Sequence, residues 1–236
     1  MIFSDQIMKK KTKLAVFDID GTIFRKNLHF ELLDELVYRE IFPRKVRSEL
    51  VSIYGQWLDH EGTYERYRDR LVSLYEDNIK GCSQRDVFEA AHNVAIFNAK
   101  RIYIYAKDLI NKIKKDHILL VISGSPIEIV KEYAGIFGFD AYYGSVYETD
   151  GDRHYTGKVS FEPVRNKGLI VKQYVAEKEI SLNSSIGMGD TESDASFLEL
   201  VERPIAFNPN MNLKKIAQDK KWKIVVEKKD VVYEIN

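Results

Sequence analysis

The sequence predicts an α/β fold, in which a Rossmann-like, mostly parallel sheet carries helices on both faces and an all-helical cap domain is inserted. Three observations support this prediction. A short apolar run, 14–17, precedes a long block with helical periodicity, 28–115, and short apolar runs then alternate with helical segments to the end of the chain. With 236 residues, 44% of them apolar, the chain can form a core domain and a smaller insertion.

The first predicted element is a buried strand over 14–17, because its apolar residues lie between lysines and the polar segment 18–22. The helical block follows directly, and it is punctuated by Pro43, Gly62 and Gly81, where one helix should end and the next begin. We therefore expect the cap to span 25–115. The catalytic core would consist of 1–24 and 116–236.

Beyond the cap, 118–122 is a second buried strand, and a helix follows with Pro126 in its first turn and Gly138 past its end. The alternating segment 142–160 turns at Asp150-Gly151, which predicts a hairpin. The remaining predicted elements are a helix over 167–178, a strand over 185–188, a helix over 191–201, a strand over 204–207 and a strand over 223–226. Strands that alternate with helices predict parallel pairing.

Charge and composition exclude several classes of partner. Lysine plus arginine and aspartate plus glutamate number 36 each, so the formal net charge is zero and we expect neither a nucleic acid nor a membrane partner. The basic run 9–13 is interpreted as a solvated lead-in to the first strand. Cys82 is the only cysteine, the longest apolar run is 118–122, and the start of the chain lacks an apolar leader. These features predict a cytoplasmic protein; the oligomeric state is left open.

Polar segments follow three of the predicted strands, at 18–22, 123–125 and 189–194. The carboxyl ends of parallel strands share one edge of the sheet, so these segments should converge. The converging acids are Asp18, Asp20, Asp190 and Asp194. Such a cluster needs a cation, and an all-oxygen ligand set suits Mg²⁺. Singly, each motif has a simpler structural explanation; for instance, Asp194 could merely cap a helix that begins after Thr191.

The same loops offer groups that bind an anion. Thr22, Ser123 and Lys167 can donate hydrogen bonds to a phosphoryl group, as can the amides of the helix that follows Ser123-Gly124-Ser125. Lys158 and Lys172 are competing candidates for the lysine. In such a site an aspartate can attack phosphorus and form an aspartyl-phosphate, while an aspartate two residues later acts as general acid and base.

The four motifs "DIDGT", the serine of "ISGS", the lysine of "NKG" and "GDTESD" resemble, in order and context, those of the haloacid dehalogenase superfamily. The helical block is similar to the helical cap of its phosphoserine phosphatase-like branch. The resemblance spans Lys13 to about Val226. It implies a Mg²⁺-dependent phosphatase, a phosphomonoesterase that acts on a small phosphorylated metabolite through an aspartyl-phosphate.

The resemblance also implies residue roles. Asp18 would be the nucleophile and Asp20 the general acid and base, and the presence of Asp20 argues against dehalogenation. The residues implied to hold Mg²⁺ are Asp18, Asp20 through its backbone carbonyl, Asp190 and Asp194. The residues implied to bind phosphate are Thr22, Ser123, Gly124 and Lys167. Two alternatives stay open: a phosphomutase, which needs the same first step, and a receiver-like phosphoacceptor module without turnover.

Two features bear on the substrate. Phosphoserine phosphatases typically carry the motif "DxDST" and a glutamate nine residues after the nucleophile. This chain has Gly21 in place of the serine of that motif and Asn27 in place of the glutamate. The aromatic residues of the cap are interpreted as helix packing rather than as a substrate wall; they are Trp57, Tyr64, Tyr67 and Tyr75. The arginines 66, 68 and 70 are interpreted as a solvated face.

Overall fold

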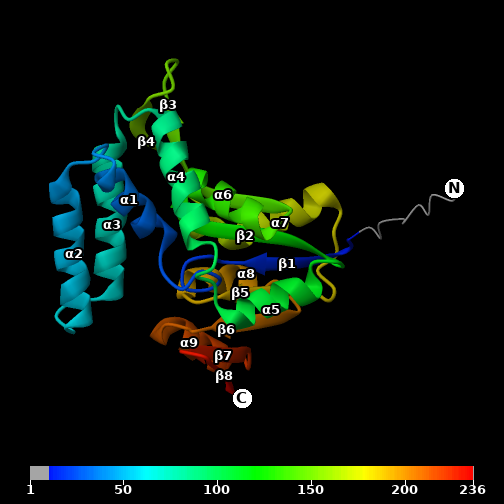
Figure 1. Cartoon of the computed structure of the whole chain (residues 1–236). Coiled ribbons are helices and arrows are strands. Elements are labelled where there is room, and N and C mark those ends of the chain that lie inside the picture. The colour runs from blue at the N-terminus through cyan, green and yellow to red at the C-terminus, as the bar shows by residue number, and fades with distance from the viewer. Residues whose placement is uncertain (1–10, 236) are drawn as a thin grey trace, which may run out of the picture.

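The computed structural model describes residues 11–235 (Figure 1), so residues 1–10, with most of the predicted lead-in, and residue 236 lie outside the description. Its strands are β1 (Lys13–Phe17), β2 (His117–Pro126), β3 (Ala141–Thr149), β4 (Tyr155–Phe161), β5 (Ile186–Gly189), β6 (Arg203–Phe207), β7 (Lys223–Lys228) and β8 (Val231–Ile235). They form one sheet in the order β4-β3-β2-β1-β5-β6-β7-β8. Pairing is parallel from β3 to β7, and only the edge strands β4 and β8 are antiparallel.

Helices lie on both faces of this sheet and above one end of it (Figure 1). They are α1 (Leu28–Tyr38), α2 (Arg44–Leu58), α3 (Tyr64–Ile79), α4 (Gln84–Asn98), α5 (Ile104–Ile113), α6 (Ile127–Phe137), α7 (Lys167–Lys178), α8 (Ala195–Leu198) and α9 (Met211–Asp219), with 3₁₀ turns η1 (Val164–Asn166) and η2 (Glu192–Asp194). The predicted α/β class with an inserted helical block is confirmed. None of the helices in residues 11–235 is both long and apolar enough to cross a membrane.

The alternation along β1 explains the two layers. Ala15 and Phe17 point to the face that packs with α5, α6 and the cap helices, whereas Leu14 and Val16 point to the face covered by α7, α8 and α9. Successive side chains of a strand point to opposite faces, so a continuous apolar run is what a strand covered on both sides requires. Every residue of β1 except Lys13 is buried.

The inserted block contains α1 to α5, but α5 packs differently from the other four helices. Tyr103, just before α5, and Tyr105 within it contact Phe207 of β6 at ring-centroid distances of 5.0 and 5.7 Å. The buried residues of α5 also join the core cluster that contains β1. We therefore propose that the cap consists of α1 to α4 and that α5 belongs to the core, which shortens the expected range 25–115 at its C-terminal end.

The antiparallel hairpin β3–β4 confirms the turn predicted at Asp150-Gly151. The hairpin also contacts the cap, because Gly81, between α3 and α4, donates a backbone hydrogen bond of 2.8 Å to Tyr155 of β4. Figure 1 shows the hairpin beside α4 at the end of the sheet that carries the cap.

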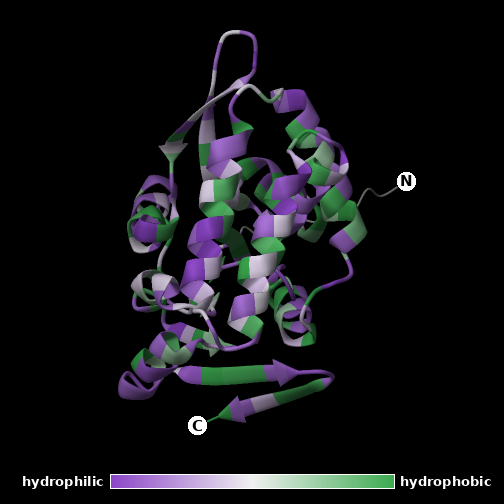
Figure 2. Cartoon of the chain, turned by 90° about the vertical axis from the view of Figure 1, so that its left-hand side faces the viewer, coloured by the Kyte–Doolittle hydropathy of each residue, from purple (hydrophilic) through white to green (hydrophobic). Residues whose placement is uncertain are grey.

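The C-terminal half contains the main differences from the predicted elements. The helix expected over 191–201 is divided into η2 and the short α8, since Asp194 binds Lys167 and the backbone of the preceding loop. The helix α9 was not predicted; Asn210 caps it, and few of its residues are buried. The edge strand β8 was also not predicted, and Figure 2 shows it pairing with β7 at the far end of the sheet. All residues of β8 are exposed, so burial imposes no alternation on its sequence.

Candidate active site

The strand order brings the predicted loops to one edge of the sheet. β1 lies between β2 and β5, so the segments after these three strands leave the sheet side by side. Asp18, directly after β1, donates its backbone N–H to Met188 of β5 at 3.0 Å. The convergence expected from parallel strands is therefore present.

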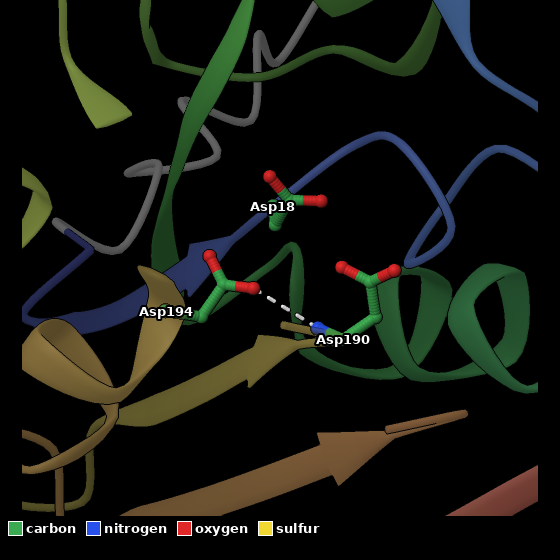
Figure 3. A group of neighbouring side chains, drawn as sticks. All are labelled: Asp18, Asp190 and Asp194. Carbon is green, nitrogen blue, oxygen red and sulfur yellow. Dashed lines mark hydrogen bonds between the residues drawn. The ribbon is translucent and has the colours of Figure 1, made fainter. Parts of the chain in front are cut away.

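Three of the four predicted acids form a compact group, which Figure 3 shows. Asp18, Asp190 and Asp194 each offer a carboxylate oxygen, and these oxygens lie within 4.8 Å of one another. Asp18 is 5% exposed, and its Oδ2 is buried with no hydrogen-bond partner among residues 11–235. A buried, unpartnered carboxylate oxygen beside two further acids fits a hard divalent cation such as Mg²⁺, which prefers oxygen ligands.

Lys167, the first residue of α7, places a positive charge inside this group. Its Nζ donates to Asp18 Oδ1 at 2.7 Å and to Asp194 Oδ1 at 2.6 Å, and the residue is 2% exposed. Burial lowers the pKa of Lys167, but the two carboxylates more than compensate, so the net shift is upward and the ammonium stays charged. Both competing lysines, Lys158 and Lys172, are exposed.

Asp194 combines the catalytic and the structural interpretations. Its Oδ1 accepts from Lys167, while its Oδ2 accepts from the backbone N–H groups of Asp190 and Thr191 at 3.0 and 3.1 Å. The hydroxyl of Thr191 completes a capping box with Asp194. The capping box therefore fixes the Asp194 side chain so that its Oδ1 faces Lys167.

Burial dominates the electrostatics of the acids. Burial, with repulsion from Asp194 and Asp20, raises the pKa of Asp18 to about 7, although Lys167 acts in the opposite direction. Burial and repulsion from Asp18 likewise raise the pKa of Asp190 well above its ordinary value. A bound cation would remove both penalties, because it favours the charged carboxylates.

Asp20 does not join the group of three acids; its side chain is held by the first amide of α1 and by two serines of β2, which extends to Pro126, beyond its expected end at residue 122. Its Oδ1 accepts from the Leu28 amide at 2.5 Å, and its Oδ2 interacts with the hydroxyls of Ser123 and Ser125 at 2.9 and 2.7 Å. Burial raises the pKa of Asp20, and the hydrogen bonds from Leu28, Ser125 and Ser123 reduce the shift. A buried carboxyl with a raised pKa can hold a proton, as a general acid must.

Ser125 is a site residue that the sequence interpretation did not single out. Its hydroxyl binds Asp20, and its amide donates to Ser123 Oγ at 3.0 Å. The repeated serine of Ser123-Gly124-Ser125 was the available pattern, because residues two apart in an extended segment point to one side.

The predicted phosphate-binding residues all lie at this edge. Thr22 and Ser123 are fully buried, and the hydroxyl of Thr22 has no partner in the described residues. A Cβ at Gly124 would lie 2.5 Å from Val164 Cγ2, so the close approach of these segments requires a glycine. The hydroxyl of Ser123 is engaged by Asp20, as described above.

The requirement for glycine is stricter at position 21 than at position 124. It adopts φ +83°, and a Cβ at this position would overlap the carboxylate of Asp190. The departure from "DxDST" at this position is therefore coupled to the position of a candidate metal ligand.

A cleft of about 770 Å³ opens between the cap and the core and reaches the acid group at Asp190. Gly21, Asp190 and Thr191 line its core side. Its cap side carries aromatic residues, namely Phe30, Tyr54, Trp57, Tyr64 and Tyr67. The interpretation of the cap aromatics as packing is right for Tyr75, which is fully buried, but incomplete for the other three residues.

Comparison with known proteins agrees with this site. The chain is 27% identical to a histidinol-phosphatase from Neisseria meningitidis, over 90% of this chain and 97% of the relative. It is 26% identical to a phosphoserine phosphatase from Methanocaldococcus jannaschii, over 95% and 96% of the two chains. The predicted enzyme class, a phosphatase, agrees with these relatives.

Solved structures show the same architecture. A phospho-aspartyl intermediate analogue of phosphoserine phosphatase aligns with a TM-score of 0.61 at 25% identity, over 94% of this chain and 96% of that one. A protein of unknown function from Bordetella pertussis aligns with a TM-score of 0.70 at 20% identity, over 91% and 98% of the chains, and shows the fold alone. The model of one family, the haloacid dehalogenase-like hydrolases, matches residues 15–199, and the chain belongs to that family.

Proposed function

We propose that the protein is a Mg²⁺-dependent phosphomonoesterase that acts on a small phosphorylated metabolite through an aspartyl-phosphate. The observation that carries the proposal is the unpartnered, buried Oδ2 of Asp18, whose other oxygen is held by Lys167. A nucleophile with one oxygen fixed and the other free is oriented for attack. The phosphatase names of the relatives support the same reaction class.

In the first step, Asp18 Oδ2 bonds to phosphorus while the ester P–O bond breaks, and Asp20 gives its proton to the departing alcohol oxygen. In the second step, Asp20 takes a proton from water, whose oxygen attacks phosphorus, so that the bond to Asp18 breaks and inorganic phosphate leaves. Burial raises the pKa of Asp20, which is the direction that a general acid requires.

Asp18, Asp190, Asp194 and the backbone carbonyl of Asp20 are the proposed cation ligands. Bound Mg²⁺ would offset the negative charge of the phosphoryl oxygens and of the acids. Thr22, Ser123, the amide of Gly124 and Lys167 are proposed to hold the phosphoryl oxygens. For Ser123, this requires that it exchange Asp20 for the substrate, whereas Lys167 uses two of its three ammonium hydrogens for Asp18 and Asp194 and keeps the third for the substrate.

The test is a phosphate-release assay with Mg²⁺ over phosphoserine, histidinol phosphate, sugar phosphates and nucleotides. We expect turnover of at least one ester, its loss on chelation of the metal, and a decrease of about 10⁴-fold or more in the Asp18→Asn variant. Asp219→Asn is the matched control, because Asp219 is exposed on α9 and should leave turnover unchanged.

The two alternatives give different outcomes in the same assay. A phosphomutase would convert a sugar phosphate into its isomer without stoichiometric phosphate release. A receiver-like module would accumulate a stable acyl-phosphate on Asp18. Full turnover by Asp18→Asn would refute the assignment of the nucleophile.

A further inference from the structure

The cap side of the cleft is a continuous wall of aromatic rings. Tyr54 of α2 lies 5.4 Å from Trp57 and 5.1 Å from Tyr67 of α3, measured between ring centroids. Trp57 in turn lies 5.3 Å from Tyr64, and Phe30 of α1 adjoins Tyr54 at 6.4 Å. We call Phe30, Tyr54, Trp57, Tyr64 and Tyr67 the aromatic wall.

The aromatic wall is accessible to a ligand. Only Tyr67 is buried, whereas Tyr54 is 37% exposed and the other rings are partly exposed. Figure 2 views the molecule from the cap side, where α2 and α3 cross the front of the sheet. Packing alone would bury these rings, as it buries Tyr75.

The wall also reaches the proposed catalytic residues. Burial and then the charges of Asp190 and Asp20 raise the pKa of Tyr64, which places this ring within the field of the acids. The same cleft is lined by Tyr64 and by Asp190. A ligand with its phosphoryl group at Asp18 would therefore extend along the wall.

Two of the charged groups at the wall, Glu31 and Arg25, are already engaged. Glu31, whose side chain is 14% exposed, lies 2.8 Å from Lys26 and 3.7 Å from Arg101. Arg25 donates to the carbonyl of Lys229 and lies over the ring of Tyr103 at 5.2 Å. The ammonium and carboxylate of an amino acid would thus find these charges engaged, and Asn27, where a glutamate would stand, caps α1 through its side chain.

These observations favour a flat, apolar group over a small zwitterion. We propose that the substrate is a phosphomonoester whose alcohol carries a planar aromatic or heteroaromatic ring, packed against Trp57 and Tyr54. A planar ring gains offset or edge-to-face contacts that a saturated ring of equal size does not, worth about 0.5–1.5 kcal/mol, or roughly 2- to 13-fold. This inference rests on the proposed phosphomonoesterase activity.

The experiment compares kcat/KM for benzyl phosphate and cyclohexylmethyl phosphate, which differ in planarity but not in ring size or linker. Ethyl phosphate measures hydrolysis without a ring, and phosphocholine tests an aliphatic cation. We expect benzyl phosphate to be preferred over cyclohexylmethyl phosphate by about 10-fold in the wild type. The ratio should fall to about one in Trp57→Ala and in Tyr54→Leu, and be largely retained in Trp57→Phe.

Tyr38→Ala is the matched control, because Tyr38 lies on α1 outside the cleft and is 83% exposed. It should leave the ratio unchanged. Calorimetry on Asp18→Asn adds a readout without turnover: benzyl phosphate should bind about 10-fold more tightly than cyclohexylmethyl phosphate.

The outcomes separate the two proposals. Hydrolysis of ethyl phosphate with equal kcat/KM for the two ring esters overturns the ring inference alone. So does a preference that persists in Trp57→Ala and Tyr54→Leu, or better turnover of phosphocholine than of benzyl phosphate. Absence of phosphate release from every ester, with Mg²⁺ present, overturns the proposed function and the ring inference together.

Discussion

The acid cluster of the core reaches the cleft through Asp190, and the aromatic wall of the cap lines the same cleft, but the two groups are held in different ways. Asp18, Lys167 and Asp194 are buried at strand or helix ends and bind one another at 2.6–2.7 Å. The wall residues lie within α1 to α3 and touch through ring contacts, and all of them except the buried Tyr67 remain partly exposed.

This difference indicates that substitutions affecting the chemical step and substitutions affecting substrate selectivity fall on separate sets of residues. A buried charged network is sensitive to every member, because removing one partner leaves another charge uncompensated. A partly exposed apolar wall tolerates exchange at a small cost, since each ring contributes contact area rather than a unique bond. We therefore expect changes in the core site to affect stability and turnover together, and changes in the wall to affect selectivity.

The substitution with the largest expected effect is Lys167→Met in the core site. It leaves two buried carboxylates without their cation, so we expect the free energy of unfolding to fall by about 3–5 kcal/mol and turnover to fall by at least about 100-fold. Urea denaturation and phosphate release measure the two effects. Lys172→Met on the exposed side of α7 is the control. A Lys167→Met protein as stable and active as that control would contradict the network.

A second change, Gly21→Ser, acts on geometry rather than on charge. The left-handed φ of +83° costs a non-glycine residue about 1–2 kcal/mol, and the new Cβ displaces the Asp190 carboxylate. We expect weaker Mg²⁺ binding, measured by metal titration, and about 100-fold lower turnover, measured by phosphate release. Gly151→Ser is matched, because a Cβ there meets nothing within 4 Å. Unchanged Mg²⁺ affinity in Gly21→Ser would refute the steric argument.

The smallest effect is expected at Glu128, which lies outside both regions. This residue of α6 is 2% exposed, and its Oε1 accepts from the Tyr155 hydroxyl at 2.6 Å, beneath the α3–α4 connection. Tyr155→Phe removes the donor from a buried carboxyl, so we expect a loss of about 1–2 kcal/mol of stability with turnover largely retained.

Glu128 also makes stability depend on pH. Burial raises its pKa above the ordinary 4.5, although the hydrogen bond from Tyr155 lowers it. A group with a raised folded-state pKa stabilises the fold fully below its unfolded value, and that contribution is lost as pH rises through the folded value. As the pH rises above about 4.5, the wild type should therefore lose more stability than Glu128→Gln. Parallel stability curves in urea denaturation would contradict this.

The sequence alone determined which residues meet at the sheet edge. Asp18 and Asp190 follow apolar strands, Ser123 lies near the C-terminal end of β2, and parallel strands must bring their carboxyl ends together. The hairpin at Asp150-Gly151 and the helix from Lys167 to Lys178 were equally predictable, because local turn chemistry and helical periodicity specify them. The exposed β8 lacked such a pattern.

Only the tertiary structure decided how those residues are used. Burial between two carboxylates distinguishes Lys167 from Lys158 and Lys172, and the pairing of Asp20 with Ser125 joins the loop after β1 to a strand residue far along the chain. The sequence positions of Trp57 and Tyr64 fit a packed helix face and a cleft wall equally well. Periodicity reports which face of a helix is apolar, but what that face meets depends on contacts between distant segments.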